Sequence, residues 1–281
     1  GKTPAPRRGA RDFRRMLCYG LDMAELMNTI VLVTGGSGGL GRALARAFAR
    51  QGSRVVIAAR SEAKLKEAAE EIGGEGGQVL ALPCDVAEKK QVEELAAAIR
   101  ARWGAVQILI NNAGVARAAS LLETTDAMWD EILRTNLTGT FYCCKVFLPG
   151  MIEAKWGRII NIGSTTSKVG YPHVSAYVSS KHGLLGLTRA LALETARMGI
   201  TVNAICPGYL DDELTRANAQ RMAEKTGKSV EQILASFAST APQRRLIDPD
   251  EVAALALLLA SEKLGGMTGQ AVSVDGGATM A

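Results

Sequence analysis

The 281-residue sequence is poor in cysteine and histidine, and it has no long hydrophobic run. Its five cysteines show neither metal-ligand nor thiol-redox spacing, and adjacent Cys143 and Cys144 are most simply small apolar residues of a helix. No apolar run is long enough to span a bilayer, and the first residues contain no hydrophobic segment of a secretory signal. These absences argue against a metal site, a membrane span and an oxidising compartment, and they predict a cytoplasmic protein.

The net charge of +5 does not indicate nucleic-acid binding, because most of the excess lies in one terminal segment. Residues 1–28 hold six basic side chains against three acidic ones, and the remaining +2 is ordinary for an enzyme that binds a phosphorylated cofactor. We expect residues 1–27 to form a basic, disordered extension, with an Arg-rich presequence as the alternative. Residues 28–281 are expected to form a single domain.

The rest of the chain alternates between strand-like and helical patterns. Apolar, β-branched runs occur at 29–34, 54–59, 78–83, 106–111, 157–163, 200–206 and 270–274, with helical periodicity between most of them. This alternation predicts parallel βαβ units with right-handed crossovers. The expected architecture is therefore α/β: a doubly wound, seven-stranded parallel sheet with helices on both faces.

A glycine-rich turn directly follows the first predicted strand. The sequence T-G-G-S-G-G-L-G occupies Thr34–Gly41, and a helical pattern continues to Arg50 before Gly52. Glycines allow a close approach of the backbone to a pyrophosphate, and the helix N-terminus supplies free N–H groups and a positive dipole end. Strand, glycine turn and helix in this order indicate a dinucleotide site rather than a merely flexible turn.

Arg60 stands at the end of the second predicted strand, where NAD-selective folds carry an acidic residue that binds the ribose 2′-hydroxyl. Positions 55–60 contain no Asp or Glu. An arginine there suits a 2′-phosphate, although a solvated arginine before a helix cap is the plain alternative. The sequence favours NADP, with NAD as the alternative cofactor.

Tyr177 and Lys181 form a Y-x-x-x-K string, with Ser164 thirteen residues upstream. On a helix, positions four apart share a face, at about 5–6 Å between Cβ atoms. A lysine charge at that spacing is expected to lower the pKa of the phenol toward neutrality, so that the tyrosine can act as a general acid or base. The string alone is weak, but it gains weight beside the glycine turn.

Together these motifs resemble the short-chain dehydrogenase/reductase family, from about Met27 to the C-terminus. Besides the motifs above, the family's N-N-A-G string matches Asn111–Gly114, its V-D-G-G string matches Val274–Gly277, and its P-G turn matches Pro207–Gly208. The resemblance implies a Rossmann fold with the catalytic residues Asn136, Ser164, Tyr177 and Lys181. It implies cofactor contacts from Gly35, Ser37, Gly38, Gly39, Leu40, Gly41, Arg60, Asp85, Val86, Asn112, Ala113, Gly114, Tyr177, Lys181, Pro207, Gly208 and Leu210.

The sequence departs from the family pattern at two positions. Asp212 stands where many members carry a threonine that meets the nicotinamide carboxamide, and Gly38 stands where many NADP-using members carry a basic residue. The negative charge of Asp212 makes the first contact doubtful, and Gly38 leaves Arg60 as the main candidate for the 2′-phosphate.

The segment Asp211–Arg245 predicts a helical lid after the sixth strand, longer than in compact acyl-carrier-protein reductases and more like polyketide ketoreductases and 3-hydroxybutyrate-type enzymes. The resemblance implies reduction of a carbonyl, with a 3-oxoacyl thioester on CoA or on acyl carrier protein as the leading substrate. The alternatives are an NAD-dependent 3-hydroxybutyrate-type or other secondary-alcohol dehydrogenase, and a non-catalytic NADP-binding sensor. Basic lid residues are candidates for a phosphopantetheine or CoA phosphate, and a solvated lid face is the alternative: Arg216, Arg221, Lys225, Lys228, Arg244 and Arg245.

The family's usual assembly and the apolar pattern of two helices predict a homotetramer, or at least a dimer. The helices around residues 127–151 and 175–198 are expected to pair across a two-fold axis. Their expected interface side chains are Phe141, Val146, Leu184, Leu187, Leu191 and Leu193.

Overall fold

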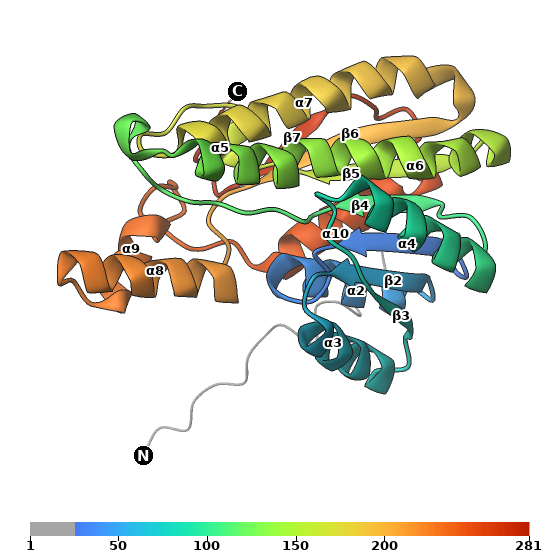
Figure 1. The fold of residues 1–281 in the computed structure, drawn as a ribbon, viewed down its shortest axis with the longest axis horizontal. Helices are drawn as coiled ribbons and strands as arrows, with labels where there is room; N and C mark the ends of the chain where they lie inside the picture. Colours follow the sequence, from blue (N-terminus) through green and yellow to red (C-terminus); the bar gives the residue numbers. More distant parts are fainter. Residues whose placement is uncertain (1–25, 281) are drawn as a thin grey trace.

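The computed structural model describes residues 26–280, so the predicted basic extension lies almost wholly outside the described residues (Figure 1). Within them a seven-stranded sheet has the order β3-β2-β1-β4-β5-β6-β7, and every neighbouring pair is parallel. The strands are β1 Ile30–Thr34, β2 Arg54–Ala59, β3 Gln78–Pro83, β4 Ile108–Asn111, β5 Gly157–Ile162, β6 Ile200–Pro207 and β7 Ala271–Val274. This confirms the predicted architecture.

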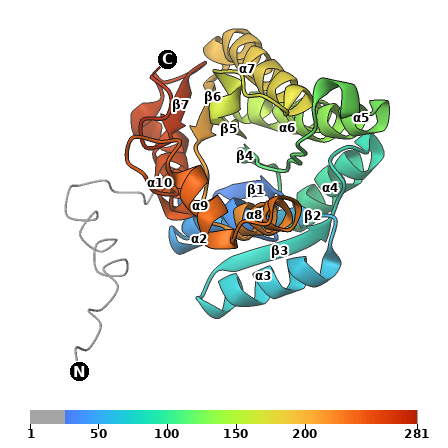
Figure 2. The ribbon, with the colours of Figure 1, turned by 90° about the vertical axis from the view of Figure 1, so that its left-hand side faces the viewer.

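Helices cover both faces of the sheet (Figure 2). Apolar side chains of α2 (Gly39–Arg50), α3 (Glu62–Gly74) and α10 (Pro249–Ala260) pack with Val31 and Val33 in one core. Side chains of α4 (Lys89–Arg102), α6 (Gly139–Ala154) and α7 (Ser175–Thr195) pack with Ile30 and Leu32 in the other. Alternate β1 side chains thus enter opposite cores, which explains why this strand is apolar at every position from 30 to 33.

One predicted helix is interrupted. Residues 127–151 were expected to be continuous, but α5 (Asp126–Leu133) and α6 are joined by a π-helical segment, Arg134–Thr138. Gly139 follows it and lies close to the chain beyond β3, because a Cβ at Gly139 would lie 2.8 Å from a methyl carbon of Val86. The π segment contains Asn136, and short π segments occur often at functional sites.

The segment after β6 is helical, as predicted. It contains α8 (Glu213–Thr226) and α9 (Val230–Ala238), which lie at the carboxyl end of the sheet (Figures 1 and 2). The two helices share a small core of their own around Ala219, Ile233 and Phe237, separate from the two large cores. None of the helices within residues 26–280 combines the length and apolarity needed to cross a membrane.

The outer face of α6 and α7 is only partly the one expected from sequence. Leu184 and Leu191 are buried in the subunit, at 1% and 7% exposure, so they do not belong to an outer face. Both residues share the inward side of α7 with Lys181, because they lie three and ten positions beyond it. Phe141 and Leu193 are exposed, at 42% and 81%, and they remain candidates for contact with a second copy.

We expect this face to mediate self-association, since large exposed apolar side chains mark interfaces. Replacing Leu193 with Glu should shift the protein toward a smaller species in light scattering at micromolar concentration, while the far-ultraviolet circular dichroism stays unchanged. Leu122→Glu is the matched control, because Leu122 is also exposed but lies in the turn before α5. A wild-type protein with the mass of one chain would contradict the prediction.

Candidate active site

The glycine turn between β1 and α2 is held in a conformation that side chains would prevent. Gly35 has φ +66°, and a Cβ at Gly41 would overlap the carbonyl oxygen of Gly35. Helix α2 starts after Gly38, which provides no side-chain cap, and its first turn contains no acidic residue. The first N–H groups of α2 are therefore available to an anion from elsewhere.

Asn112, just beyond β4, braces this turn from the neighbouring strand. Its side-chain amide donates to the carbonyl oxygens of Thr34 and Gly35, at 3.0 and 3.2 Å. In return the hydroxyl of Thr34 accepts the N–H groups of Asn112 and Ala113, both at 3.1 Å. Asn112 was predicted as a cofactor contact, and the structure places it behind the turn.

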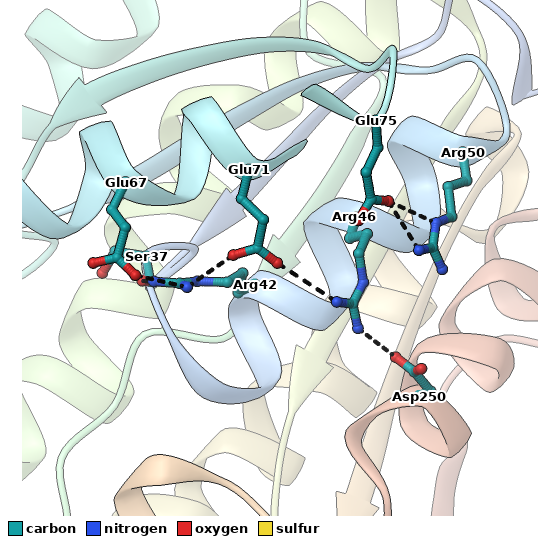
Figure 3. Close-up of polar contacts among 8 residues, drawn as sticks. All are labelled: Ser37, Arg42, Arg46, Arg50, Glu67, Glu71, Glu75 and Asp250. Atoms are coloured by element: carbon teal, nitrogen blue, oxygen red, sulfur yellow. Dashed lines mark hydrogen bonds and ion pairs between the residues drawn. The ribbon is translucent and has the colours of Figure 1, made fainter. Parts of the chain in front are cut away.

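A row of ion pairs ties α2 to α3 and α10 (Figure 3). Arg42 pairs with Glu67 and Glu71 at 3.0 and 2.9 Å, and it also donates to the carbonyl oxygen of Ser37 at 3.0 Å. Two further arginines of α2 continue the row, Arg46 to Glu71 and Asp250, and Arg50 to Glu75. Arg42 thus holds the carbonyl of Ser37 in the glycine turn, while its own position is held by ion pairs with α3.

A cavity of about 220 Å³ opens beside the glycine turn. Seven of the predicted cofactor residues line it: Gly35, Ser37, Arg60, Asp85, Val86, Ala113 and Gly114. Arg60 is exposed and forms no ion pair with any carboxylate of residues 26–280. A turn whose glycines leave the backbone open, a helix N-terminus without its own cap and an arginine without an ion pair fit a phosphorylated dinucleotide.

The sequence prediction missed other residues of this cavity. Ser61 lines it and also caps α3, its hydroxyl accepting the N–H of Lys64 at 3.4 Å. Val115 and Thr135 line it as well, from the loop after β4 and from the π segment. Ser61 could have been found, because it follows Arg60 in sequence. Thr135 could not, since only the π segment turns it toward the cavity.

Ser164, Tyr177 and Lys181 come together at the carboxyl end of β5. The hydroxyl of Ser164 forms a hydrogen bond with the side chain of Tyr177, and it accepts the N–H of Thr166 at 3.2 Å. Lys181 lies one helical turn after Tyr177, with its ammonium 5.7 Å from the ring centroid. The ammonium donates to the carbonyl oxygen of Ile162 at 2.7 Å, one residue beyond the last β4–β5 pair.

The pKa of Tyr177 differs from the expectation drawn from sequence. Burial raises it above its usual value, and the hydrogen bond from Ser164 opposes that rise only in part. Burial also lowers the pKa of Lys181 to about 8. The expected lowering of the tyrosine pKa by lysine is therefore not found, because both groups lose solvation and the ammonium is turned toward Ile162.

Asn136 holds two elements together through its side chain. Its amide oxygen accepts the N–H of Val115 at 2.8 Å, and its amide nitrogen donates to the Val115 carbonyl and the Ser180 hydroxyl at 2.9 and 3.0 Å. Ser180 in turn donates to the carbonyl oxygen of Tyr177 at 2.8 Å. The side chain of Asn136 thus links the loop after β4 to the helix that carries Tyr177.

The other predicted residues lie around these two groups. Gly38, Gly39, Leu40 and Gly41 form the turn and the start of α2. Pro207 ends β6, and Gly208 donates its N–H to the carbonyl oxygen of Val274 at 3.0 Å. Leu210 bridges to Ile247 and packs against a large core, outside the 220 Å³ cavity.

Comparison with known proteins gives a consistent result. The family described as short chain dehydrogenase matches residues 29–223. The granaticin polyketide synthase putative ketoacyl reductase 1 of Streptomyces violaceoruber is 40% identical over 88% of this chain and 92% of its own length. The D-beta-hydroxybutyrate dehydrogenase of Cupriavidus necator is 36% identical, over 88% and 96%. The crystal structure of a single-residue variant of actinorhodin polyketide ketoreductase with NADPH has a TM-score of 0.88 and 36% identity, over 90% of this chain and 98% of that one.

The buried ammonium of Lys181 leads to a prediction about stability. Its pKa of about 8 lies below the ordinary 10.5, so between these values the unfolded chain binds more protons than the folded one. Burying the charge thus costs stability below pH 8, and this cost disappears as the pH rises from 8 to 10.5. Lys181→Met should raise the free energy of unfolding at pH 7 by up to about 3 kcal/mol.

Urea denaturation at pH 7, 8.5 and 10 measures this effect as the difference between variant and wild type. The difference should shrink as the pH rises, whereas the exposed control Lys64→Met should show little difference at any pH. A Lys181→Met protein that is no more stable at pH 7, or a difference that is constant with pH, would show that the ammonium is adequately solvated.

Proposed function

The chain belongs to the short chain dehydrogenase family, and from this premise we propose that it reduces the 3-oxo group of an acyl thioester with NADPH. As a member of the family it is an oxidoreductase that acts on keto or hydroxy groups and uses a nicotinamide cofactor. The observation that carries the finer proposal is the hydrogen-bonded pair Ser164 and Tyr177, with Lys181 one turn away, at the same end of the sheet as the glycine turn.

When bound, the cofactor supplies a hydride for the carbonyl carbon. Tyr177 would give its proton to the carbonyl oxygen, and its raised pKa keeps the hydroxyl protonated across the neutral range. Ser164 would donate a hydrogen bond to the same oxygen as charge develops on it. Lys181 would stand one helical turn from Tyr177, with its ammonium held by the carbonyl oxygen of Ile162. Asn136 would act as a positioning residue through Val115 and Ser180.

Arg60 and Ser61 support NADP rather than NAD. Both line the cavity beside the glycine turn, and no carboxylate among its lining residues stands at the end of β2. Asp85 lines the cavity from the end of β3, but its carboxylate already accepts the N–H of Ala87 at 3.0 Å. A guanidinium at the end of β2 can pair with a 2′-phosphate, whereas a free 2′-hydroxyl offers it no charge.

Ion pairs of the lid leave fewer basic residues to bind the phosphate of an acyl-CoA or acyl-phosphopantetheine substrate. Arg216 pairs with Asp211 at 2.5 Å and Arg245 pairs with Glu251, so these two basic residues are already committed. The other four predicted lid cations form no ion pair among residues 26–280, although Arg221 donates to Asn218 at 2.6 Å: Arg221, Lys225, Lys228 and Arg244. The ketoacyl reductase relatives support this substrate class, whereas the hydroxybutyrate dehydrogenase relative supports a smaller hydroxy acid as the second candidate.

A substrate screen with a tyrosine variant tests the proposal. NADPH absorbance should fall in the presence of 3-oxoacyl thioesters, and faster than NAD is reduced in the presence of 3-hydroxybutyrate. Tyr177→Phe removes only the phenolic hydroxyl, so it should abolish turnover and change cofactor affinity by no more than a few-fold. A variant that keeps more than a tenth of the wild-type rate would overturn the role of Tyr177, and no turnover with either substrate class would favour a cofactor-binding sensor.

Arg60 gives a separate prediction about the cofactor. A charge-assisted guanidinium–phosphate contact is worth about 1.5–3 kcal/mol, so Arg60→Ala should raise the KM for NADPH by roughly 10- to 100-fold. The KM for NADH should change little, because NADH lacks the 2′-phosphate. Arg100→Ala, at an exposed position of α4, controls for the loss of one positive charge. Equal wild-type efficiency with the two cofactors would contradict the prediction.

A further inference from the structure

The first turn of the lid lies against the glycine turn. Asp212 caps α8, with its Oδ1 accepting the N–H of Thr215 at 2.9 Å. Its other carboxylate oxygen faces Gly39, because a Cβ built at Gly39 would lie only 2.8 Å from Asp212 Oδ2. Glu213 follows, and its Oε2 lies 3.8 Å from a Cβ built at Gly38. Two lid carboxylates therefore stand at the start of α2.

This is the place in the fold that favours an anion. Helix α2 has no acidic residue in its first turn and no side-chain cap at Gly38, so its own sequence leaves the positive dipole end uncompensated. Phosphates of dinucleotides bind at such a helix start. In this structure a carboxylate from the distant lid segment lies there instead.

We propose that Asp212 is a built-in competitor of the cofactor's phosphates, so that it sets cofactor affinity and couples the lid to cofactor binding. The inference rests on the proposed function, since it concerns the same cofactor site. A phosphate that approaches Gly39 meets the carboxylate of Asp212, which carries a charge of the same sign and already lies against this glycine. Binding therefore has to move the first turn of α8 away from α2.

Other lid carboxylates do not share this position. Asp211 is paired with Arg216 at 2.5 Å, and Glu224 accepts from Gln220 at 3.0 Å on an exposed part of α8. Neither is near a glycine of the turn. The effect should accordingly belong to Asp212, with a smaller part from Glu213, and not to the total charge of the lid.

Asp212→Asn isolates the charge, because asparagine caps a helix as well as aspartate does and keeps an oxygen for the Thr215 N–H. The dissociation constant of NADPH, measured directly by its fluorescence without substrate, should fall about tenfold in this variant. Glu224→Gln removes the same charge from the same helix and should leave the constant within about twofold of the wild-type value. The gain in Asp212→Asn should shrink at high salt, since screening weakens the repulsion between charges.

A second substitution and thermal denaturation distinguish a change in NADPH affinity from a failure to fold. Asp212→Thr should also tighten NADPH binding, and both variants should unfold cooperatively, as thermal denaturation will show. Equal or weaker binding in both folded variants, or an equal gain in Glu224→Gln, would overturn the inference while leaving the proposed function intact. A wild-type protein that binds neither NADPH nor NADH would overturn both.

Discussion

The reciprocal hydrogen bonds between Thr34 and Asn112 fix the point on which the whole site depends. The chain leaves β1 toward α2 on one face and leaves β4 toward the other, so the two exits diverge from adjacent strands. The bonds of Asn112 to Thr34 and Gly35 hold these exits at a set separation. Beyond the β4 exit, Val115 is held by Asn136, and Asn136 is bonded to Ser180 on α7. A continuous series of hydrogen bonds between backbone and amide groups thus links the glycine turn to the helix that carries Tyr177.

The side chains of Tyr177 and Lys181 are buried at a cost in free energy. Burial raises the pKa of Tyr177 and lowers that of Lys181, because loss of solvent disfavours the charged form of each group. The carbonyl of Ile162 partly offsets this cost for the ammonium. A buried polar chain also crosses this part of the core, in which Asn111 donates to Asn161 and Asn161 donates to Thr188.

Most of the fold and many of the site residues could be predicted from the sequence, because hydrophobic period and glycine spacing are local properties. The seven strands and the helical segment after β6 follow from such patterns. The π segment around Asn136 could not be predicted, since hydrophobic periodicity does not reveal a local change in the helical hydrogen-bond pattern. Leu184 and Leu191 were assigned to an outer face because periodicity shows that a helix has an apolar stripe but not whether that stripe faces the core or the outside. The pKa of Tyr177 was misjudged because the spacing of Tyr177 and Lys181 shows that they are close but not that both side chains are buried.

The small core shared by α8 and α9 has an evolutionary consequence. Ala219, Ile233 and Phe237 pack with one another, and the ring of Phe237 stacks on Tyr209 at 4.5 Å between centroids. A substitution in this cluster should disturb packing mainly within the lid, because the cluster is separate from the two large cores. Substitutions within this cluster can therefore change the lid while the packing of the two large cores is kept. Sequence change in this part of the lid is accordingly expected to be better tolerated than change in the large cores beneath the sheet's helices.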